Sequence, residues 1–302
     1  MPLENPPTLF ALPSLRFLEV SGADAEAFLN AQLSRNVAGR GSDRAPLSAW
    51  HDSKGRVRAL LRALRNAERW LVMAHGSDPH ALIRNLTVFV LRADVQLRDV
   101  SAHWHGGAVL GDLDAWLAAR GAELGEASGD VLSGDGAFLV RVSRQMAYLA
   151  GEKTRATLAS ELPAADGPQG ELAEIRAGLL DLSPELADRF SPHMLNLDRL
   201  GVLAFDKGCY PGQEVIARVQ HLGNLKRRLF RFSAPLGEPP GVGSPLTDPS
   251  GVEVGEILRV ARAGARRVEF LAVVRIDAVN EPLAFAGAPQ VPIRKEPLPG
   301  EP

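Results

Sequence analysis

The sequence predicts an α+β protein with two related α+β units and a small C-terminal β-barrel. The order strand, helix, strand, strand, helix occurs roughly twice within residues 1–226. In residues 227–302, proline and glycine separate short β-like runs, a spacing typical of a small barrel or sandwich. We therefore expect a first region, 1–226, whose units lie at roughly 1–100 and 101–226 with interleaving left open, and a β-domain at 227–302.

The composition is that of an ordinary globular protein. The chain has 302 residues, a net charge of −2 and a single cysteine. A charge so near neutral gives no sign of a polyanionic partner, and one cysteine excludes an intramolecular disulfide, as is usual in a reducing compartment. The first residues lack the basic segment and apolar core of a signal peptide, and no apolar run is long enough to span a membrane. We expect a cytoplasmic protein without a membrane partner.

The first unit carries local signals for strands, turns and helices. Ser21 lies three residues before Asp24, a weak form of the capping box, and the apolar residues that follow recur at helical spacing. The sequence 52–55 predicts a hairpin turn, and Asp78-Pro79 predicts a helix start with proline in the first turn. The expected strands are 15–20, 47–50, 56–64 and 70–74, and the expected helices begin after residues 21 and 77.

The second unit and the C-terminal domain follow the same logic. Residues 95–100 are expected to begin the second series, and Gly-rich connections are expected at 121–136 and 164–170. The further strands expected in the second unit are 108–110, 138–142 and 146–150, with helices at 112–120 and 152–162. The C-terminal strands are expected at 229–232, 255–260, 268–274 and 291–293.

The segment 206–218 concentrates the reactive chemistry of the chain. It contains the only cysteine, Cys209, between Gly208 and Gly212, which permit positive φ, and it begins with Asp206-Lys207. Residues 208–212 should form a tight turn, and 213–219 fit either a short helix or the start of a strand. In the helical case Cys209 would lie just before a helix N-terminus, where the dipole and Lys207 favour a thiolate.

Such a thiol could be a nucleophile, a metal ligand or a redox-sensitive group. The alternative is a small buried apolar residue, since free cysteine is among the most buried residue types. The charged and Gly-rich neighbours of Cys209 favour the functional interpretation.

Other candidate sites are weaker. His103 and His105 would share a face of a strand, but no acidic residue or cysteine completes a metal spacing, so we expect no metal site. No nucleophile elbow or phosphate loop is present. The basic clusters 226–228 and 262–267 could contact phosphate, but they are more typical of solvated strand faces or ion pairs, so nucleic-acid binding is a secondary hypothesis.

The segment 174–198 also holds suggestive side chains. Glu174 could pair with the donor edge of a flat heterocycle, and Arg176 suits an anionic tail. The same residues fit a helix followed by a loop that braces the core.

The cysteine segment resembles a known family signature. The segment resembles the signature of the YgfZ family at Lys207-Gly208-Cys209-Tyr210-Pro211-Gly212-Gln213-Glu214 and, just after it, at Ala217-Arg218. Members of this family are folate-binding proteins related to the aminomethyltransferase (T protein) of the glycine cleavage system and to the mitochondrial factor that matures iron–sulfur proteins. Supporting matches lie at 22–25 with Phe28, Leu29 and Gln32, at 52–56, 176–178, Phe190, Pro192 and 196–197, and together they cover about two thirds of the chain.

The resemblance implies an aminomethyltransferase-like ring of three domains. Tetrahydrofolate, or a related folate, would lie in the central opening with the cysteine loop facing it, and iron–sulfur enzymes or cluster assembly proteins would be the partners. The implied role is assembly or repair of iron–sulfur clusters, which supports tRNA modification indirectly. The expected site comprises a key thiol and a neighbouring amine, Cys209 and Lys207, with folate contacts among Glu174, Arg176, Asn196, Tyr210, Gln213, Glu214 and Arg218.

Two departures from the T protein bear on activity. Its acidic pair after the hairpin glycines aligns here with Arg58 and Ala59, which cannot supply carboxylate chemistry, so aminomethyl transfer is disfavoured. Its Arg-x-Glu-x-Gly motif is replaced by Glu174-Ile175-Arg176-Ala177-Gly178, with the charges exchanged. The alternative functions are a folate-dependent one-carbon transferase and a non-enzymatic RNA or protein adaptor.

Overall fold

The first of three sheets is built from residues 15–99 and carries two helices. The computed structural model describes residues 6–39, 41–134, 136–153 and 160–300. The first sheet has the order β3-β4-β5-β2-β6 and is antiparallel throughout. Its strands are β2 (Leu15–Ser21), β3 (Ser48–His51), β4 (Val57–Asn66), β5 (Arg69–His75) and β6 (Gln96–Asp99), and its helices are α1 (Ala25–Gln32) and α2 (Pro79–Thr87).

The second sheet repeats the strand order of the first. Its order is β11-β1-β7-β10-β9-β8, so β8, β9, β10 and β7 correspond to β3, β4, β5 and β2. The position that β6 takes in the first sheet is filled in the second by β1, from the N-terminal end of the chain. The elements are β1 (Thr8–Ala11), β7 (Trp104–Leu110), α3 (Leu113–Ala118), β8 (Val131–Gly134), β9 (Ala137–Ser143), β10 (Met146–Glu152) and β11 (Ala164–Ala165).

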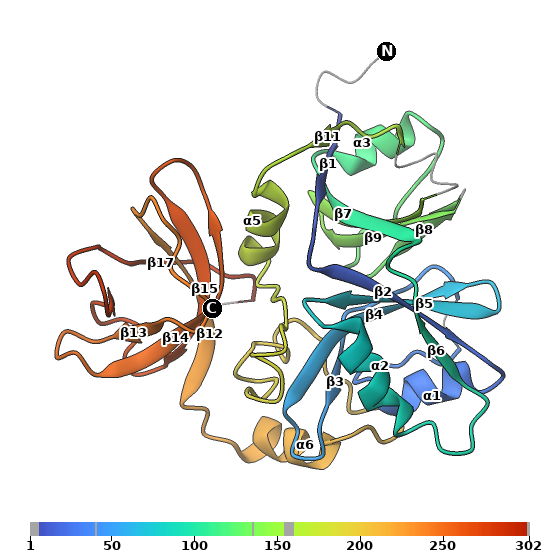
Figure 1. Ribbon diagram of the computed structural model, residues 1–302, viewed down its shortest axis with the longest axis horizontal. Helices are drawn as coiled ribbons and strands as arrows, with labels where there is room; N and C mark the ends of the chain where they lie inside the picture. The colour runs from blue at the N-terminus through green and yellow to red at the C-terminus, as the bar shows by residue number, and fades with distance from the viewer. Residues whose placement is uncertain (1–5, 40, 135, 154–159, 301–302) are drawn as a thin grey trace.

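The third sheet follows two further helices, α5 (Gln169–Arg176) and α6 (Gln213–Leu222). Its order is β16-β13-β14-β15-β12-β17, and α5 lies between this sheet and the second one (Figure 1). Its strands are β12 (Arg227–Ala234), β13 (Pro245–Thr247), β14 (Glu253–Arg262), β15 (Val268–Arg275), β16 (Ala284–Phe285) and β17 (Arg294–Glu296). α6 lies beside β3 at the base of the molecule, close to the first sheet and far from α3 (Figure 1).

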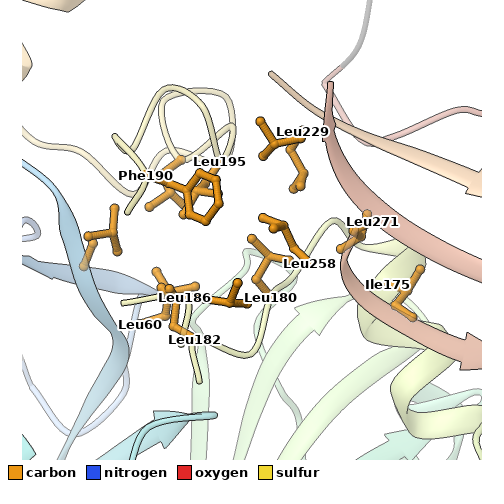
Figure 2. Close-up of a cluster of buried hydrophobic side chains, with 14 of the residues drawn as sticks. Leu60, Ile175, Leu180, Leu182, Leu186, Phe190, Leu195, Leu229, Leu258 and Leu271 are labelled. Atoms are coloured by element: carbon orange, nitrogen blue, oxygen red, sulfur yellow. The ribbon is translucent and has the colours of Figure 1, made fainter. Parts of the chain in front are cut away.

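β4 is buried on both faces because its successive side chains enter different cores. Ala59, Leu61 and Ala63 face the core beneath α1 and α2, whereas Leu64 faces the core between the first and second sheets. Leu60 belongs to a third cluster, in which leucines from the segment after α5 meet leucines of the C-terminal sheet (Figure 2). Burial of these apolar side chains stabilises the fold by about 25 cal/mol per Å² of apolar surface removed from water, and the shared clusters hold the three sheets together.

Local signals placed most elements correctly. The Asp78 carboxylate caps α2 by accepting hydrogen bonds from the backbone N–H groups of His80 and Ala81. In the hairpin turn, Asp52 Oδ1 accepts the N–H groups of Lys54 (2.9 Å) and Arg56 (2.7 Å).

Five expectations need correction. Ser21 ends β2 and does not cap α1; Asp24 takes the cap position without a side-chain cap, and its carboxylate instead accepts the N–H of Asp94. Strand 95–100 does not begin a second series, because β6 pairs with β2 of the first sheet. β8 lies inside the expected connection 121–136, and the last C-terminal strand is 294–296 rather than 291–293. Of the helix expected at 152–162, Glu152 ends β10, and 154–159 lie outside the described residues.

Candidate functional site: the Cys209 cavity

Cys209 lies on an exposed loop that leads directly into a helix. Residues 213–222 form α6, so the helical alternative is correct, and Gly212 caps it with φ 75°. Gly208, in contrast, does not have a positive φ angle. Cys209 is an exposed free thiol and not a buried apolar residue. The loop therefore presents sulfur to the exterior three residues before the helix cap.

A large cavity opens beside this thiol. Its volume is about 1090 Å³, above the usual range for small-molecule sites, and we call it the Cys209 cavity. Its walls come from the hairpin turn between β3 and β4, the cysteine loop, the first turns of α6 and two partly exposed aromatic residues, Phe89 and Phe205. Gly55 and Gly212, both with positive φ, bring the hairpin turn and the cysteine loop into contact.

Lys207 anchors the loop to the end of α1. Its ammonium donates hydrogen bonds to three backbone carbonyl oxygens, those of Asn30 (2.6 Å), Leu33 (2.6 Å) and Arg35 (3.0 Å). An ammonium has three N–H donors, so these carbonyls use all of them, and they lie at a helix C-terminus that favours a cation. Burial lowers the pKa of Lys207 from 10.5 to about 8. The expected role of Lys207 in activating the thiol is thus replaced by a structural one.

Two buried polar side chains in the cavity wall find no hydrogen-bond partner among the described residues. His51 is fully buried, and neither ring nitrogen has a partner within the described part of the chain. The hydroxyl of Tyr210 is in the same state, and the two rings lie 5.9 Å apart. Burial lowers the pKa of His51 to about 3, against the opposing effect of Asp52, and raises the pKa of Tyr210 to about 12. Both groups are therefore neutral at pH 7.

Glu174 lies in the interior and not in the Cys209 cavity. Its carboxylate accepts hydrogen bonds from the Tyr148 hydroxyl (2.5 Å) and from the Arg259 guanidinium, and His75 Nδ1 lies 3.7 Å away. Burial alone would raise the pKa of Glu174, but Arg259 and the two other partners lower it to about 2. With its side chain 1% exposed and its oxygens occupied, Glu174 is unavailable as the expected folate contact.

The same group has the spacing of a metal site but already contains a cation. Ligand atoms of His75, Glu174 and Asp181 lie within 4.8 Å of one another. The Arg259 guanidinium pairs with both carboxylates, at 3.0 Å from Asp181 Oδ2. This guanidinium supplies the positive charge that balances the two acids, so we assign the group to structure.

Two other expected folate contacts hold the C-terminal sheet in place. Arg176, at the end of α5, forms a bidentate pair with Glu269 of β15, at 3.0 and 2.7 Å. Asn196 is buried; its amide donates to the Leu229 carbonyl (2.8 Å), and its side-chain oxygen accepts from Arg228. Both side chains are committed to contacts within the protein and lie outside the Cys209 cavity.

Of the three α6 residues expected to contact folate, two line the Cys209 cavity and one lies on the exterior of the helix. Gln213 Oε1 accepts the Tyr210 N–H at 3.3 Å and lines the cavity, as does Glu214. Arg218 pairs with Glu214 at 3.2 Å on the exposed face of the helix and does not line the cavity. The structure thus brings Cys209 together with Tyr210, Gln213 and Glu214 from the expected set.

Several residues that line the cavity were not predicted from the sequence. Phe89, Phe205 and His51 line the Cys209 cavity, although they come from separate regions of the chain. His51 directly precedes the hairpin turn, which was the only local signal for it. Arg58, which the sequence comparison aligned with a T-protein acid, lies in the cavity wall with its guanidinium 2.9 Å from Asp188 and 5.1 Å from the Trp50 ring.

No helix within the described residues is both long and apolar enough to cross a membrane.

Sequence relatives were found among curated bacterial proteins. An uncharacterised protein of Haemophilus influenzae is 29% identical over 244 residues, which cover 78% of this chain and 77% of the relative. The tRNA-modifying protein YgfZ of Edwardsiella ictaluri is 27% identical over 74% of this chain and 70% of its own length. YgfZ of Escherichia coli O127:H6 is 24% identical over 97% of this chain and 93% of its own length. No protein-family model matches the chain.

A solved structure shares the fold over nearly the whole chain. The aminomethyltransferase T of the glycine cleavage system from Bartonella henselae superposes with a TM-score of 0.73, covering 98% of this chain and 86% of that one, at 17% identity. The α+β, aminomethyltransferase-like fold expected from the sequence is confirmed.

Proposed function

Since its sequence relatives and its fold assign the chain to the YgfZ family, we propose that it is a folate-binding accessory protein in iron–sulfur cluster assembly or repair. On this proposal it supports tRNA modification indirectly, by maintaining iron–sulfur enzymes that modify tRNA. Tetrahydrofolate or a related folate is the proposed ligand, and iron–sulfur enzymes or cluster assembly proteins are the proposed partners.

The observation that carries the proposal is an exposed thiol in the wall of a ligand-sized cavity. Cys209 borders about 1090 Å³ of space, which is enough for a bicyclic ring with an attached aromatic ring and tail. Phe89 and Phe205 offer aromatic faces to a flat heterocycle, and Lys54 and Arg58 offer cations to carboxylates. The residues present therefore fit a folate.

Fewer residues are proposed as folate contacts than the sequence suggested. Tyr210, Gln213 and Glu214 remain proposed contacts because they line the Cys209 cavity. Glu174, Arg176, Asn196 and Arg218 are not proposed, because the structure engages them elsewhere.

Cys209 is the proposed point of contact with iron–sulfur chemistry. Thiolates are the usual protein ligands of iron–sulfur clusters, and a cluster takes several of them. The chain has one cysteine, so any further thiolate ligand would come from a partner protein. An exposed thiol on a loop fits such a shared role better than a buried one would.

Two experiments test this proposal. Calorimetric titration with tetrahydrofolate should show binding, and its absence at millimolar ligand would contradict the folate assignment. Expression of Cys209→Ala in a strain lacking the native gene should fail to restore iron–sulfur enzyme activity, whereas the wild type and the loop control Gly208→Ala should restore it. Full rescue by Cys209→Ala would remove the thiol from the function.

A one-carbon transferase is not proposed. Arg58 carries a guanidinium where the T protein has an acid, and Ala59 is buried in the core. Neither side chain carries a carboxylate, so no observation favours aminomethyl transfer.

A further inference from the structure

A second cavity lies on the opposite side of α6 from the Cys209 cavity. It measures about 430 Å³ and is bounded by the hairpin turn, the segment 191–194, the buried side of α6 and the segment 223–227 that leads into β12. Lys54 and Val215 line both cavities, so the two spaces adjoin at the start of α6. We call this space the basic cavity.

Four cations and no carboxylate line the basic cavity. They are Lys54, Arg56, Lys226 and Arg227. None of the four forms an ion pair with any carboxylate that the structure describes; Arg56 makes a single side-chain bond, to the Arg189 carbonyl at 3.3 Å. Asp52, which caps the hairpin turn, lines the Cys209 cavity instead. Four unpaired cations at one cavity produce a positive potential that favours an anionic ligand.

A buried histidine adds a second, independent indication of a ligand. His193 is 3% exposed and lines the basic cavity. Its Nε2 lies 2.9 Å from Gln220 Oε1, but its Nδ1 has no partner in the part of the chain that the structure describes. Buried polar atoms normally have hydrogen-bond partners, so an orphaned nitrogen at a cavity points to a missing polar ligand.

The apolar part of the wall discriminates between kinds of anion. Met194, Val219 and Leu225 lie among the cations. A nucleic-acid backbone needs exposed cations but gains little from an apolar enclosure. A chain of carboxylates separated by methylene groups matches both kinds of wall.

We propose that the basic cavity binds the glutamate tail of the folate held in the Cys209 cavity, a chain that can carry several γ-linked glutamates. This inference rests on the proposed function. The ring system lies beside Cys209, the tail passes Lys54 and Val215 at the start of α6, and each added glutamate brings one carboxylate toward Arg56, Lys226 or Arg227. Binding should therefore tighten as glutamates are added.

The test compares tetrahydrofolate carrying one glutamate with tetrahydrofolate carrying five. Partly exposed ion pairs contribute modestly, so three of them should give roughly tenfold tighter binding for the pentaglutamate in calorimetry at low salt. The gain should shrink as salt is raised. The variant Lys226→Gln with Arg227→Gln should lose this gain and keep its affinity for the monoglutamate. Arg266→Gln, an exposed cation outside both cavities, is the matched control and should keep the gain.

The outcomes separate this inference from the proposed function. If the wild type binds both ligands equally, the tail site is wrong and the folate site stands. If neither ligand binds, the tail site and the folate site are both wrong. If the double variant instead loses steeply salt-dependent binding of a tRNA while its pentaglutamate preference is unchanged, the basic cavity is an RNA contact and the inference is wrong.

Discussion

Gly212, the residue before α6, lies directly against Gly55 in the turn between β3 and β4: a Cβ built on Gly212 would come 2.6 Å from the Gly55 Cα and 2.6 Å from the Asp52 carbonyl oxygen. No real Cβ could occupy that place without movement of the backbone. The contact fixes the cysteine loop to the turn that borders both cavities. Glycine is therefore required at 212 by close approach and by its φ of 75°.

Gly212→Ala should destabilise the protein. A left-handed conformation costs a non-glycine residue about 1–2 kcal/mol, and the clash with the hairpin turn adds to that cost. Gly208→Ala is the matched control, because a Cβ at 208 meets no atom within 4 Å and that residue lacks a positive φ. Urea unfolding should show a clear loss for Gly212→Ala and little change for Gly208→Ala. Equal losses would contradict the described contact.

The two tyrosines of the chain should respond differently to loss of their hydroxyl groups. Tyr148 donates to the ionised Glu174, so Tyr148→Phe should lower the free energy of unfolding by about 1.5–3 kcal/mol. The buried Tyr210 hydroxyl has no described partner, so Tyr210→Phe should leave stability unchanged or raise it. Chemical denaturation of both variants is the measurement. A loss for Tyr210→Phe as large as that for Tyr148→Phe would show that the Tyr210 hydroxyl is bonded.

Glu174 predicts a specific dependence of stability on pH. Its pKa is about 2 in the folded protein, against 4.5 for an unperturbed glutamate. The unfolded chain therefore takes up this proton first as the pH falls, so the contribution of Glu174, on the order of 3 kcal/mol, is complete above pH 4.5 and is lost between about pH 4.5 and 2.

Glu174→Gln checks this prediction. The variant should be much less stable at pH 7, because Arg259 loses a buried partner. The difference between wild type and variant, measured by urea unfolding, should shrink as the pH is lowered from 5 to 3. A difference that stays constant over that range would exclude the low pKa.

Local signals sufficed for much of the fold. The Asp78 cap, the Asp52 turn and the apolar spacing of β4 and β5 each depend on a few neighbouring residues, and each was predictable. The sequence left both a helix and a strand possible for 213–219, because the spacing of Val215, Ile216 and Val219 fits the apolar pattern of either element. Packing of Ile216 against Gly55, together with the φ of Gly212, selects the helix.

The site depended on contacts between distant residues. Lys207 reaches carbonyls 172 to 177 positions earlier in the chain, and Arg259 reaches Glu174 across 85 residues. Neither pairing leaves a local pattern. The sequence therefore drew attention to the cysteine loop but could not separate the residues that line the cavity from those, such as Asn196, that hold the sheets together.

If the cavity beside Cys209 binds folate, the reactivity of the thiol itself reports that binding most directly. Iodoacetamide should alkylate the native protein at one site, since Cys209 is exposed and is the only cysteine. Saturating tetrahydrofolate should slow this reaction several-fold, whereas p-aminobenzoylglutamate, which lacks the pteridine, should protect far less. Parallel alkylation of glutathione controls for consumption of the reagent. An unchanged alkylation rate at millimolar tetrahydrofolate would contradict folate binding beside Cys209.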